Sequence, residues 1–479
     1  MDLSNLTIKK ARQLLDSKQV SSIQLTQYYL NQIENKDKDI NAFITVCKES
    51  ALKQAEAADK RIQDGETNEL LGIPYSIKDS FLTKGILTTA GSKVLSNFIA
   101  PYNGTVVQRL ESLGAILIGK TNLDAWGHGG STENSDYGIT KNPYDFSRVS
   151  GGSSGGSAAS VASDMCLFSI AEDTGGSIRL PAGFCGTYGL KVTYGRVSRY
   201  GCIAYASSLD TVGPITRDVN DLQIILNAIG GKDEKDATVQ NLETGAEKIE
   251  QILKNDNSKP LYGIKFALPK EYLTDGIDSE VADKFKNLIN KVESLGGEIK
   301  NVSIPSTKYC IPTYYVIAFA ETSTNLARYD GIRYGNHVNT NKGWMEDVVA
   351  MRSSYISTET KRRIMLGTYV LSAGYYDAYY LKAQKVRAKL IKEFDEVYKD
   401  CDVILSPISP TPAFHIGENT SDPMKMYLED VFTVTANLVG GPSLAIPFGR
   451  SSANLPIGLQ LIGNKWSEKL LISIGACLK

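Results

Sequence analysis

Ser150-Gly-Gly-Ser153-Ser154-Gly-Gly-Ser157 and Asp173-Thr-Gly175-Gly176-Ser177-Ile-Arg179 are the two glycine-serine clusters around which this chain of 479 residues is organised. Glycine pairs let the backbone approach a ligand closely and present several N–H groups at once. The residues between the clusters, 158–171, are small or apolar, which predicts a buried helix beginning at Ser157 and a strand. We therefore interpret this stretch as a functional site, although glycine-serine tracts also occur as plain surface linkers.

The segments on either side of this stretch alternate between helical and strand patterns. Helices are expected over 6–15, from Ser21 onward with a Ser21/Gln24 capping box, and after the 42–46 strand up to about residue 63. Further helices are expected over 105–110, 218–230, 279–295 and 368–398. Strands are expected over 42–46, 70–78, 115–118, 261–268, 403–405, 443–446 and 457–462, and loops over 120–149, 189–197 and 208–214. This alternation is typical of α/β architecture.

We expect a single domain over 1–479. Its parts are an N-terminal helical scaffold (1–65), a core that carries the serine clusters (66–230), an exposed excursion with many charged residues (231–260), and a last part (261–479) that holds the remaining strands. Within this last part, residues 443–479 are expected to return to the first part's sheet.

Composition excludes several classes of protein. An apolar fraction of 42% with 22% charged residues is ordinary for a globular protein, and the net charge of −1 argues against a chain that grips nucleic acid unaided. The seven cysteines are scattered and never spaced as Cys-x-x-Cys, which suits a reducing compartment without structural disulfides or zinc. No apolar run approaches the ~18 residues of a membrane span. A cytoplasmic location is expected, with an organellar address left open.

Three familiar kinds of site match the serine clusters only in part. A phosphate loop needs Gly-x4-Gly-Lys, but Ser157 stands where the lysine is required. An aspartic dyad needs two Asp-Thr/Ser-Gly turns, and Asp210-Thr-Val212 lacks the glycine of the second. A nucleophile elbow, Gly-x-Ser-x-Gly, matches at 151–155 and 152–156. It should follow a strand, whereas 141–150 has loop character, and it needs one of the chain's three histidines. The dyad and the elbow remain alternatives.

A fourth kind of site activates serine with lysine. A serine hydroxyl is a weak nucleophile without an adjacent base. Lysine is a base only when neutral, and burial among apolar neighbours disfavours its charged form. Lys78 ends the apolar segment 70–78, where the chain enters the core. It is therefore the lysine best placed for this chemistry, although most lysines are simply surface charges.

Lys78, 151–156 and 173–179 together resemble the amidase signature family, whose triad is Ser-cisSer-Lys. The separations also match: 75 residues from Lys78 to Ser153 and 24 from Ser153 to Ser177. The resemblance implies a mixed central β-sheet covered by helices on both faces. It implies that Ser177 is the nucleophile, that Ser153 is a bridging serine in a cis peptide, and that Lys78 is the base. The implied oxyanion hole consists of the backbone N–H groups of Thr174, Gly175, Gly176 and Ser177.

Within that family the chain is most similar to the glutamine-hydrolysing A subunits of glutamyl-tRNA(Gln) amidotransferases, through residues 120–122, 131–134, 194–201, 331–335, 361–368 and 374–380. The resemblance implies that Arg363 binds the α-carboxylate of glutamine, that Asp430 binds its α-amino group, and that Tyr314 lines the pocket. It also implies a heterotrimer with a B and a C subunit. The B subunit would bind most of the tRNA and use ATP and Mg²⁺, while this chain would bind no metal or cofactor.

One loop departs from the family pattern. The pattern reads Asp-Glu-Phe-x-Met-Gly where this chain has Asp124-Ala-Trp-Gly-His128-Gly129, in a loop that flanks the acyl pocket of the family.

Two further hypotheses about the function are kept. A stand-alone amidase would share the triad but would not need Arg363 and Asp430, and a non-catalytic scaffold protein would not need Lys78 and both serines. Service of aspartyl-tRNA(Asn) is also left open.

Overall fold

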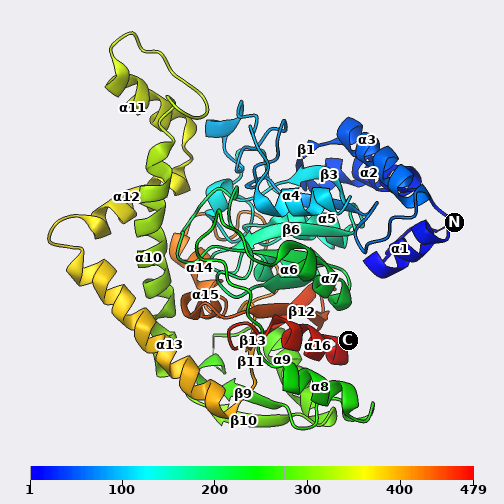
Figure 1. Ribbon diagram of the computed structural model, residues 1–479. Coiled ribbons are helices and arrows are strands. Elements are labelled where there is room, and N and C mark those ends of the chain that lie inside the picture. Colours follow the sequence, from blue (N-terminus) through cyan, green and yellow to red (C-terminus); the bar gives the residue numbers. More distant parts are fainter. Residues whose placement is uncertain (1, 274–275) are drawn as a thin grey trace.

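An 11-stranded sheet forms the centre of the computed structural model, which describes residues 2–273 and 276–479 (Figure 1). Its strand order is β1-β3-β2-β6-β8-β7-β12-β13-β11-β9-β10. The strands are β1 (Phe43–Val46), β2 (Pro74–Lys78), β3 (Ile116–Thr121), β6 (Phe168–Asp173), β7 (Tyr188–Lys191), β8 (Thr211–Thr216), β9 (Lys265–Pro269), β10 (Glu298–Val302), β11 (Val403–Pro407), β12 (Ser443–Arg450) and β13 (Pro456–Gly463). β3, β2 and β6 are parallel, as are β11, β9 and β10, whereas the strands from β6 to β11 pair antiparallel. The predicted mixed sheet is confirmed.

Both faces of the sheet are covered by helices. Successive side chains of a strand point to opposite faces, and on β12 Leu444 and Ile446 join one hydrophobic cluster while Ala445 joins another. α16 packs on the first side with Leu470 and Leu471. α6 packs on the second side with Leu180, Ala182 and Phe184. The helices around the sheet are α1 (Ile8–Asp16), α2 (Ser22–Ile40), α3 (Lys48–Gln63), α4 (Thr105–Ser112), α5 (Gly155–Ala162), α6 (Arg179–Phe184), α7 (Val219–Ile229), α8 (Ala246–Lys254), α9 (Ser279–Ser294), α14 (Pro423–Leu428), α15 (Val434–Val439) and α16 (Glu468–Leu478).

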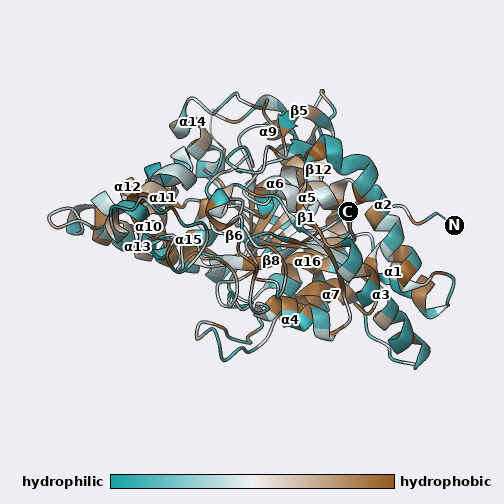
Figure 2. Cartoon of the chain, turned by 90° about the horizontal axis from the view of Figure 1, so that it is seen from above, coloured by the Kyte–Doolittle hydropathy of each residue, from teal (hydrophilic) through white to brown (hydrophobic). Residues whose placement is uncertain are grey.

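A group of long helices stands at one side of the molecule, opposite α1 to α3 (Figure 2). It consists of α10 (Cys310–Asn325), α11 (Trp344–Tyr355), α12 (Thr358–Leu371) and α13 (Lys382–Asp400). The single helix predicted over 368–398 is wrong. α12 ends at Leu371, Gly374 takes a positive φ of 85°, and a π-helical turn over Asp377–Leu381 leads into α13. A glycine in that conformation favours the end of a helix.

Three segments predicted as loops contain strands. Residues 189–197 and 208–214 overlap β7 and β8, which are central strands buried on both faces and therefore lack a polar-apolar alternation. Gly213 is required there, because a Cβ at this position would lie 2.0 Å from the carbonyl oxygen of Leu190. The 120–149 segment holds the hairpin of β4 (Lys141–Asn142) and β5 (Asp145–Val149). The helix expected from Ser157 begins at Gly155.

The charged segment 231–260 includes α8, which packs against α16 and buries Ile252. Other side chains of this segment are exposed to solvent, and Leu253 is 79% exposed. Among the helices of the described residues, none is both long enough and apolar enough to cross a lipid bilayer. All seven cysteines are free thiols.

Candidate active site

The sheet brings the two serine clusters and Lys78 together. β2 ends at Lys78 and β6 ends at Asp173, and these two strands are adjacent and parallel. Their carboxyl ends therefore lie at the same edge of the sheet. The second serine cluster follows β6 directly, and the first opens α5, which packs on β2 and β6. The pairing of β2 with β6 thus brings together segments that are far apart in the sequence.

Lys78 contacts Ser153 directly. Lys78 Nζ lies 2.8 Å from Ser153 Oγ, and both side chains are buried. The peptide bond between Gly152 and Ser153 is cis, at the position that the resemblance implies. The backbone N–H of Ser154 donates to the carbonyl of Ser177 over 3.2 Å, which joins the two clusters. No hydrogen bond links the Ser153 and Ser177 hydroxyls, both of which the structure describes. The hydrogen bond that a proton relay between the two hydroxyls needs is therefore not formed in this conformation.

Asp173 fixes the loop that carries Ser177. Its carboxylate accepts hydrogen bonds from the backbone N–H groups of Gly176 (3.0 Å) and Ile178 (3.1 Å) and pairs with the Arg179 guanidinium over 2.9 Å. Burial would raise the pKa of Asp173, but the positive charges of Arg179 and Lys191 outweigh it and hold the pKa well below its usual range. The carboxylate is therefore ionised, and it holds the backbone of the loop both before and after Ser177.

The glycines of this loop are packed so closely against neighbouring side chains that no Cβ fits. A Cβ on Gly175 would lie 2.4 Å from the Tyr314 hydroxyl oxygen, and Gly176 has a φ of 140° against Thr433. Within the described residues, the N–H groups of Gly175 and Ser177 donate to no protein acceptor. The N–H of Gly176 is already taken by Asp173. The oxyanion hole implied over Thr174–Ser177 therefore lacks the Gly176 donor as the loop stands.

Glu172 is a site residue that sequence reasoning missed. Its Oε1 lies 3.2 Å from Lys78 Nζ, and both side chains are buried. The surroundings of Lys78 are thus not purely apolar, contrary to the sequence-based expectation. A charged residue next to Asp173, inside an otherwise apolar and uncharged strand, was the available signal.

Arg363 and Asp430 meet in one aromatic cluster. Arg363 is buried on α12, where its Nε donates to Glu359 over 2.8 Å and its Nη1 to the Tyr205 hydroxyl over 2.8 Å. The Tyr315 ring lies 5.8 Å from Arg363 Cζ, and its hydroxyl donates to Asp430 Oδ2 over 2.7 Å. Glu359, which sequence reasoning also missed, is the partner that balances the guanidinium charge.

Asp430 is connected to the serine loop through Thr433. The Thr433 N–H donates to the carbonyl of Asp430, and its hydroxyl donates to the carbonyl of Gly175 over 2.6 Å. Tyr314 also lies close to Gly175. Thr433 therefore links Asp430 to the loop that carries Ser177. A cavity of about 150 Å³ opens on Arg363 and is lined in addition by Ser131, Glu133, Asn134, Glu359 and Tyr427.

Comparison with known proteins identifies the family. The amidase family model matches residues 24–472. The chain belongs to the amidase family. It is 49% identical over 472 residues to the A subunit of glutamyl-tRNA(Gln) amidotransferase from Geotalea daltonii, an alignment that covers 98% of this chain and 96% of the relative.

Solved amidases share the fold along nearly the whole chain. The crystal structure of the A subunit of glutamyl-tRNA(Gln) amidotransferase from Thermotoga maritima superposes with a TM-score of 0.80 at 39% identity and covers 100% of this chain and 95% of its own. The native peptide amidase from Stenotrophomonas maltophilia superposes with a TM-score of 0.82 at 26% identity and covers 99% of this chain and 96% of its own.

The loop that departs from the A-subunit pattern supports the aromatic cluster. His128 is buried between the hydroxyls of Thr322 and Thr360, each 3.2 Å from a ring nitrogen, and its ring lies edge-on to Tyr205 at 4.7 Å. Burial lowers the pKa of His128 well below its usual value, so the ring is neutral. Because the Tyr205 hydroxyl also accepts a hydrogen bond from Arg363, His128 supports the Arg363 cluster through Tyr205.

The structure does not support the two alternative chemistries. His337 lies 3.1 Å from the carbonyl of Gly331 and His415 lies 3.3 Å from Ser147, so with His128 packed among threonines no histidine of the described chain contacts the serine clusters. β5 does precede the first cluster, contrary to the loop character predicted for 141–150, but the elbow still lacks its base. Asp173 is committed to Arg179 and shares no proton with Asp210.

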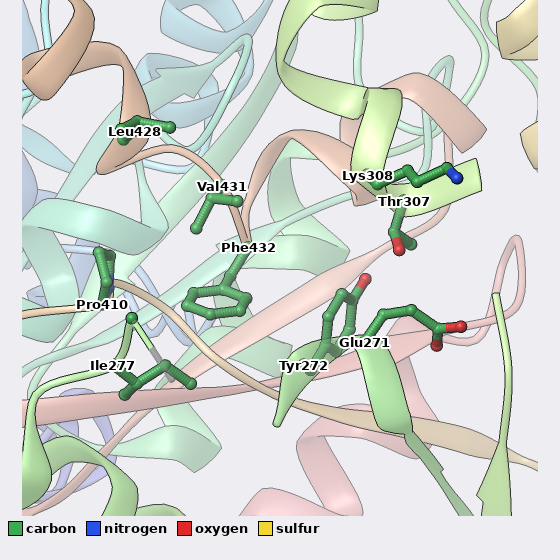
Figure 3. Close-up of a pocket in the computed structure, with 10 residues that line it drawn as sticks. Glu271, Tyr272, Ile277, Thr307, Lys308, Pro410, Leu428, Val431 and Phe432 are labelled. Carbon is green, nitrogen blue, oxygen red and sulfur yellow. The ribbon is translucent and has the colours of Figure 1, made fainter. Parts of the chain in front are cut away.

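A larger cavity of about 440 Å³ opens beside Phe432 (Figure 3). Its lining is mostly apolar, with Tyr272, Ile277, Val431 and Phe432 around it and Glu271 and Lys308 at its edge. Neither this cavity nor the smaller one at Arg363 has Lys78, Ser153 or Ser177 in its described lining. The smaller cavity opens on Arg363, whose guanidinium lies near the Tyr315 ring that contacts Asp430.

Proposed function

We propose that this chain is the glutaminase component, the A subunit, of a glutamyl-tRNA(Gln) amidotransferase, which hydrolyses glutamine to glutamate and ammonia. One observation carries the proposal: a buried arginine and a partly buried carboxylate meet in one aromatic cluster beside the Ser177 loop. A zwitterionic amino acid needs one fixed cation and one fixed anion. The names of the 49%-identical relatives agree with this substrate.

The reaction begins with attack of Ser177 Oγ on the side-chain amide of glutamine. The Ser177 proton passes to Ser153 as Ser153 passes its own to neutral Lys78, and the oxyanion is held by backbone N–H groups of the 174–177 loop. Collapse of the tetrahedral intermediate breaks the C–N bond, and the proton returns through Ser153 to the leaving ammonia. Water then attacks the acyl-enzyme by the same relay in reverse and releases glutamate.

The remaining steps belong to partner subunits. We propose a heterotrimer in which a B subunit binds most of the tRNA, uses ATP and Mg²⁺ to activate the misacylated tRNA and receives the ammonia, together with a C subunit. This chain would need no metal or cofactor of its own, and a cytoplasmic location fits its seven free cysteines. Co-purification of the native protein tests the assembly, since an isolated chain without two companions would contradict it.

Arg363→Ala and Asp430→Ala should each lower kcat/KM for glutamine about ten- to hundredfold. Each change removes a charge-assisted contact of ~1.5–3 kcal/mol, at ~1.4 kcal/mol per decade. A small neutral amide that never used these residues should be hydrolysed at the wild-type rate. Lys361→Ala is the matched control, because Lys361 lies on the same helix but binds the carbonyl of Ser353 outside the cavity. Equal losses on both substrates would assign the two residues to the fold, and no loss on either would favour a stand-alone amidase.

Glutamine selectivity should also depend on pH through Asp430. Burial raises the pKa of this carboxyl to about 7. The hydrogen bond from Tyr315 and the charge of Arg363 lower the pKa, whereas the negative charge of Glu429 raises it further. Below about pH 7 Asp430 in the free protein is protonated and cannot pair with the α-ammonium group. The ratio of kcat/KM for glutamine to kcat/KM for the neutral amide should therefore fall as pH decreases through about 7, because titration of the triad cancels in the ratio. A ratio that is flat with pH, or that behaves alike in Asp430→Asn, would contradict this role.

A further inference from the structure

A buried carboxylate stands behind the lysine of the triad. Glu172 Oε1 lies 3.2 Å from Lys78 Nζ, and the same nitrogen lies 2.8 Å from Ser153 Oγ. The Lys78 side chain is fully buried and that of Glu172 is 3% exposed. The lysine amine is thus held between the serine that it must deprotonate and a carboxylate that takes no part in the Ser-cisSer-Lys relay.

The other oxygen of Glu172 is fixed by two donors. The Ser80 hydroxyl donates to Oε2 over 3.1 Å, and the Cys202 thiol donates to the same oxygen over 2.7 Å. Burial, and then the negative charge of Glu172, raise the pKa of the Cys202 thiol, so it remains a proton donor. Glu172 therefore has an assigned partner on each oxygen, and its carboxylate cannot swing away from Lys78 without breaking them.

We propose that Glu172 is a positioning residue for the catalytic base: it holds the Lys78 amine against Ser153 and stabilises the ammonium that Lys78 becomes when it takes up the serine proton. The proposal rests on the hydrolytic mechanism above. In that scheme Glu172 exchanges no proton. The proton moves from Ser177 to Ser153 and from Ser153 to Lys78, and it returns by the same route to the leaving group.

The carboxylate has a consequence for the rate of hydrolysis. Lys78 becomes an ammonium only when it takes up the serine proton, so the charge of Glu172 acts mainly on the state reached during attack. Removal of that charge should therefore lower kcat about ten- to hundredfold with little change in KM, because the ammonium formed during attack loses its partner.

Three other titratable groups surround this pair. Asp124, in the loop after β3, binds the N–H groups of Thr132 and Asn134, and burial raises its pKa to about 6. Asp210, at the start of β8, binds Thr174, and burial, then the charge of Glu172, raises its pKa to about 7. Cys202 completes the set. Asp124 and Asp210 make no direct contact with Lys78, but Asp210 interacts electrostatically with Glu172 and needs its own control.

The test is kcat and KM for Glu172→Gln, measured separately on any amide that the wild type hydrolyses, so that it does not depend on glutamine being the substrate. Glu172→Thr removes the same charge with a smaller side chain and gives a second measurement if the glutamine variant is unstable. The expected result is a fall in kcat with a nearly unchanged KM in both variants. Glu172→Asp keeps the charge and should restore most of kcat.

Two control variants separate positioning from structure. Cys202→Ala removes a donor to Glu172 but keeps the carboxylate beside Lys78, so it should lose less of kcat than Glu172→Gln. Asp210→Asn removes a neighbouring charge that does not contact Lys78, so it should also lose less of kcat than Glu172→Gln. The proposal is overturned if the neutral Glu172 variants keep the wild-type kcat, or if Glu172→Asp loses as much of kcat as Glu172→Gln does. Absence of glutamine hydrolysis by the wild type would instead overturn the proposed substrate.

Discussion

Ser177→Ala should abolish amide hydrolysis, with a fall in kcat on the order of 10⁶. Loss of a serine nucleophile removes the covalent route altogether, and the catalysis that remains comes from binding and the oxyanion donors alone. The loop itself should persist, because Asp173, Arg179 and Thr433 hold it by contacts that do not involve the Ser177 hydroxyl. Ammonia release measured over long incubations is the readout.

Ser154→Ala is the matched control for this change. Ser154 lies in the first serine cluster, and its hydroxyl donates to the backbone carbonyl of Glu172 over 3.2 Å. We expect this variant to keep most of the activity, because the lost contact is a neutral hydrogen bond worth about 1 kcal/mol. If Ser154→Ala is inactive and Ser177→Ala is not, the nucleophile has been assigned to the wrong cluster.

Lys78→Ala should lower kcat by at least the ~10² to 10⁴ that general-base catalysis contributes. It also leaves Glu172 as an unpaired buried carboxylate, which should destabilise the protein by about 3–5 kcal/mol. A thermal unfolding experiment is therefore needed beside the rate measurement, since loss of fold and loss of base would otherwise look alike.

Lys78→Arg separates the two effects. The guanidinium can still pair with Glu172 but stays protonated and cannot act as a base. This variant should therefore be folded and inactive. Lys120→Arg is its control: Lys120 is also buried and pairs with Asp79 over 2.9 Å, but it contacts neither serine cluster. A Lys78→Arg enzyme with a near-normal rate would mean that position 78 only supplies a positioning charge.

The candidate catalytic residues could be named because they lie in compact motifs, whereas their contacts depend on strand order. Lys78 and Ser177 are candidates from the sequence, and the pairing of β2 with β6 places their segments at the same edge of the sheet. Glu172 was missed because it stands beside Asp173, whose role in the motif accounted for the charge there. Its approach to Lys78 follows from the neighbouring strand, which no local pattern reveals.

The errors in the fold have a common physical origin. β7 and β8 are central strands whose glycines and proline allow close packing against neighbouring backbone, and those same residues are typical of loops. The outer strands and the amphipathic helices were predictable because burial on one face leaves a periodic pattern. The break between α12 and α13 was missed because the residues before and after Gly374 are all compatible with a helix, so that this single glycine was the only signal.

The nucleophile can be tested most directly by trapping it with a diazo-ketone analogue of glutamine and mapping the modified residue by peptide mass spectrometry. The analogue carries the α-amino and α-carboxylate groups that Asp430 and Arg363 are proposed to bind, and its reactive carbon takes the place of the side-chain amide. We expect one adduct, on Ser177, that is absent from Ser177→Ala and reduced in Arg363→Ala. An adduct on Ser153 or Ser154 would contradict the assignment of Ser177 as the nucleophile.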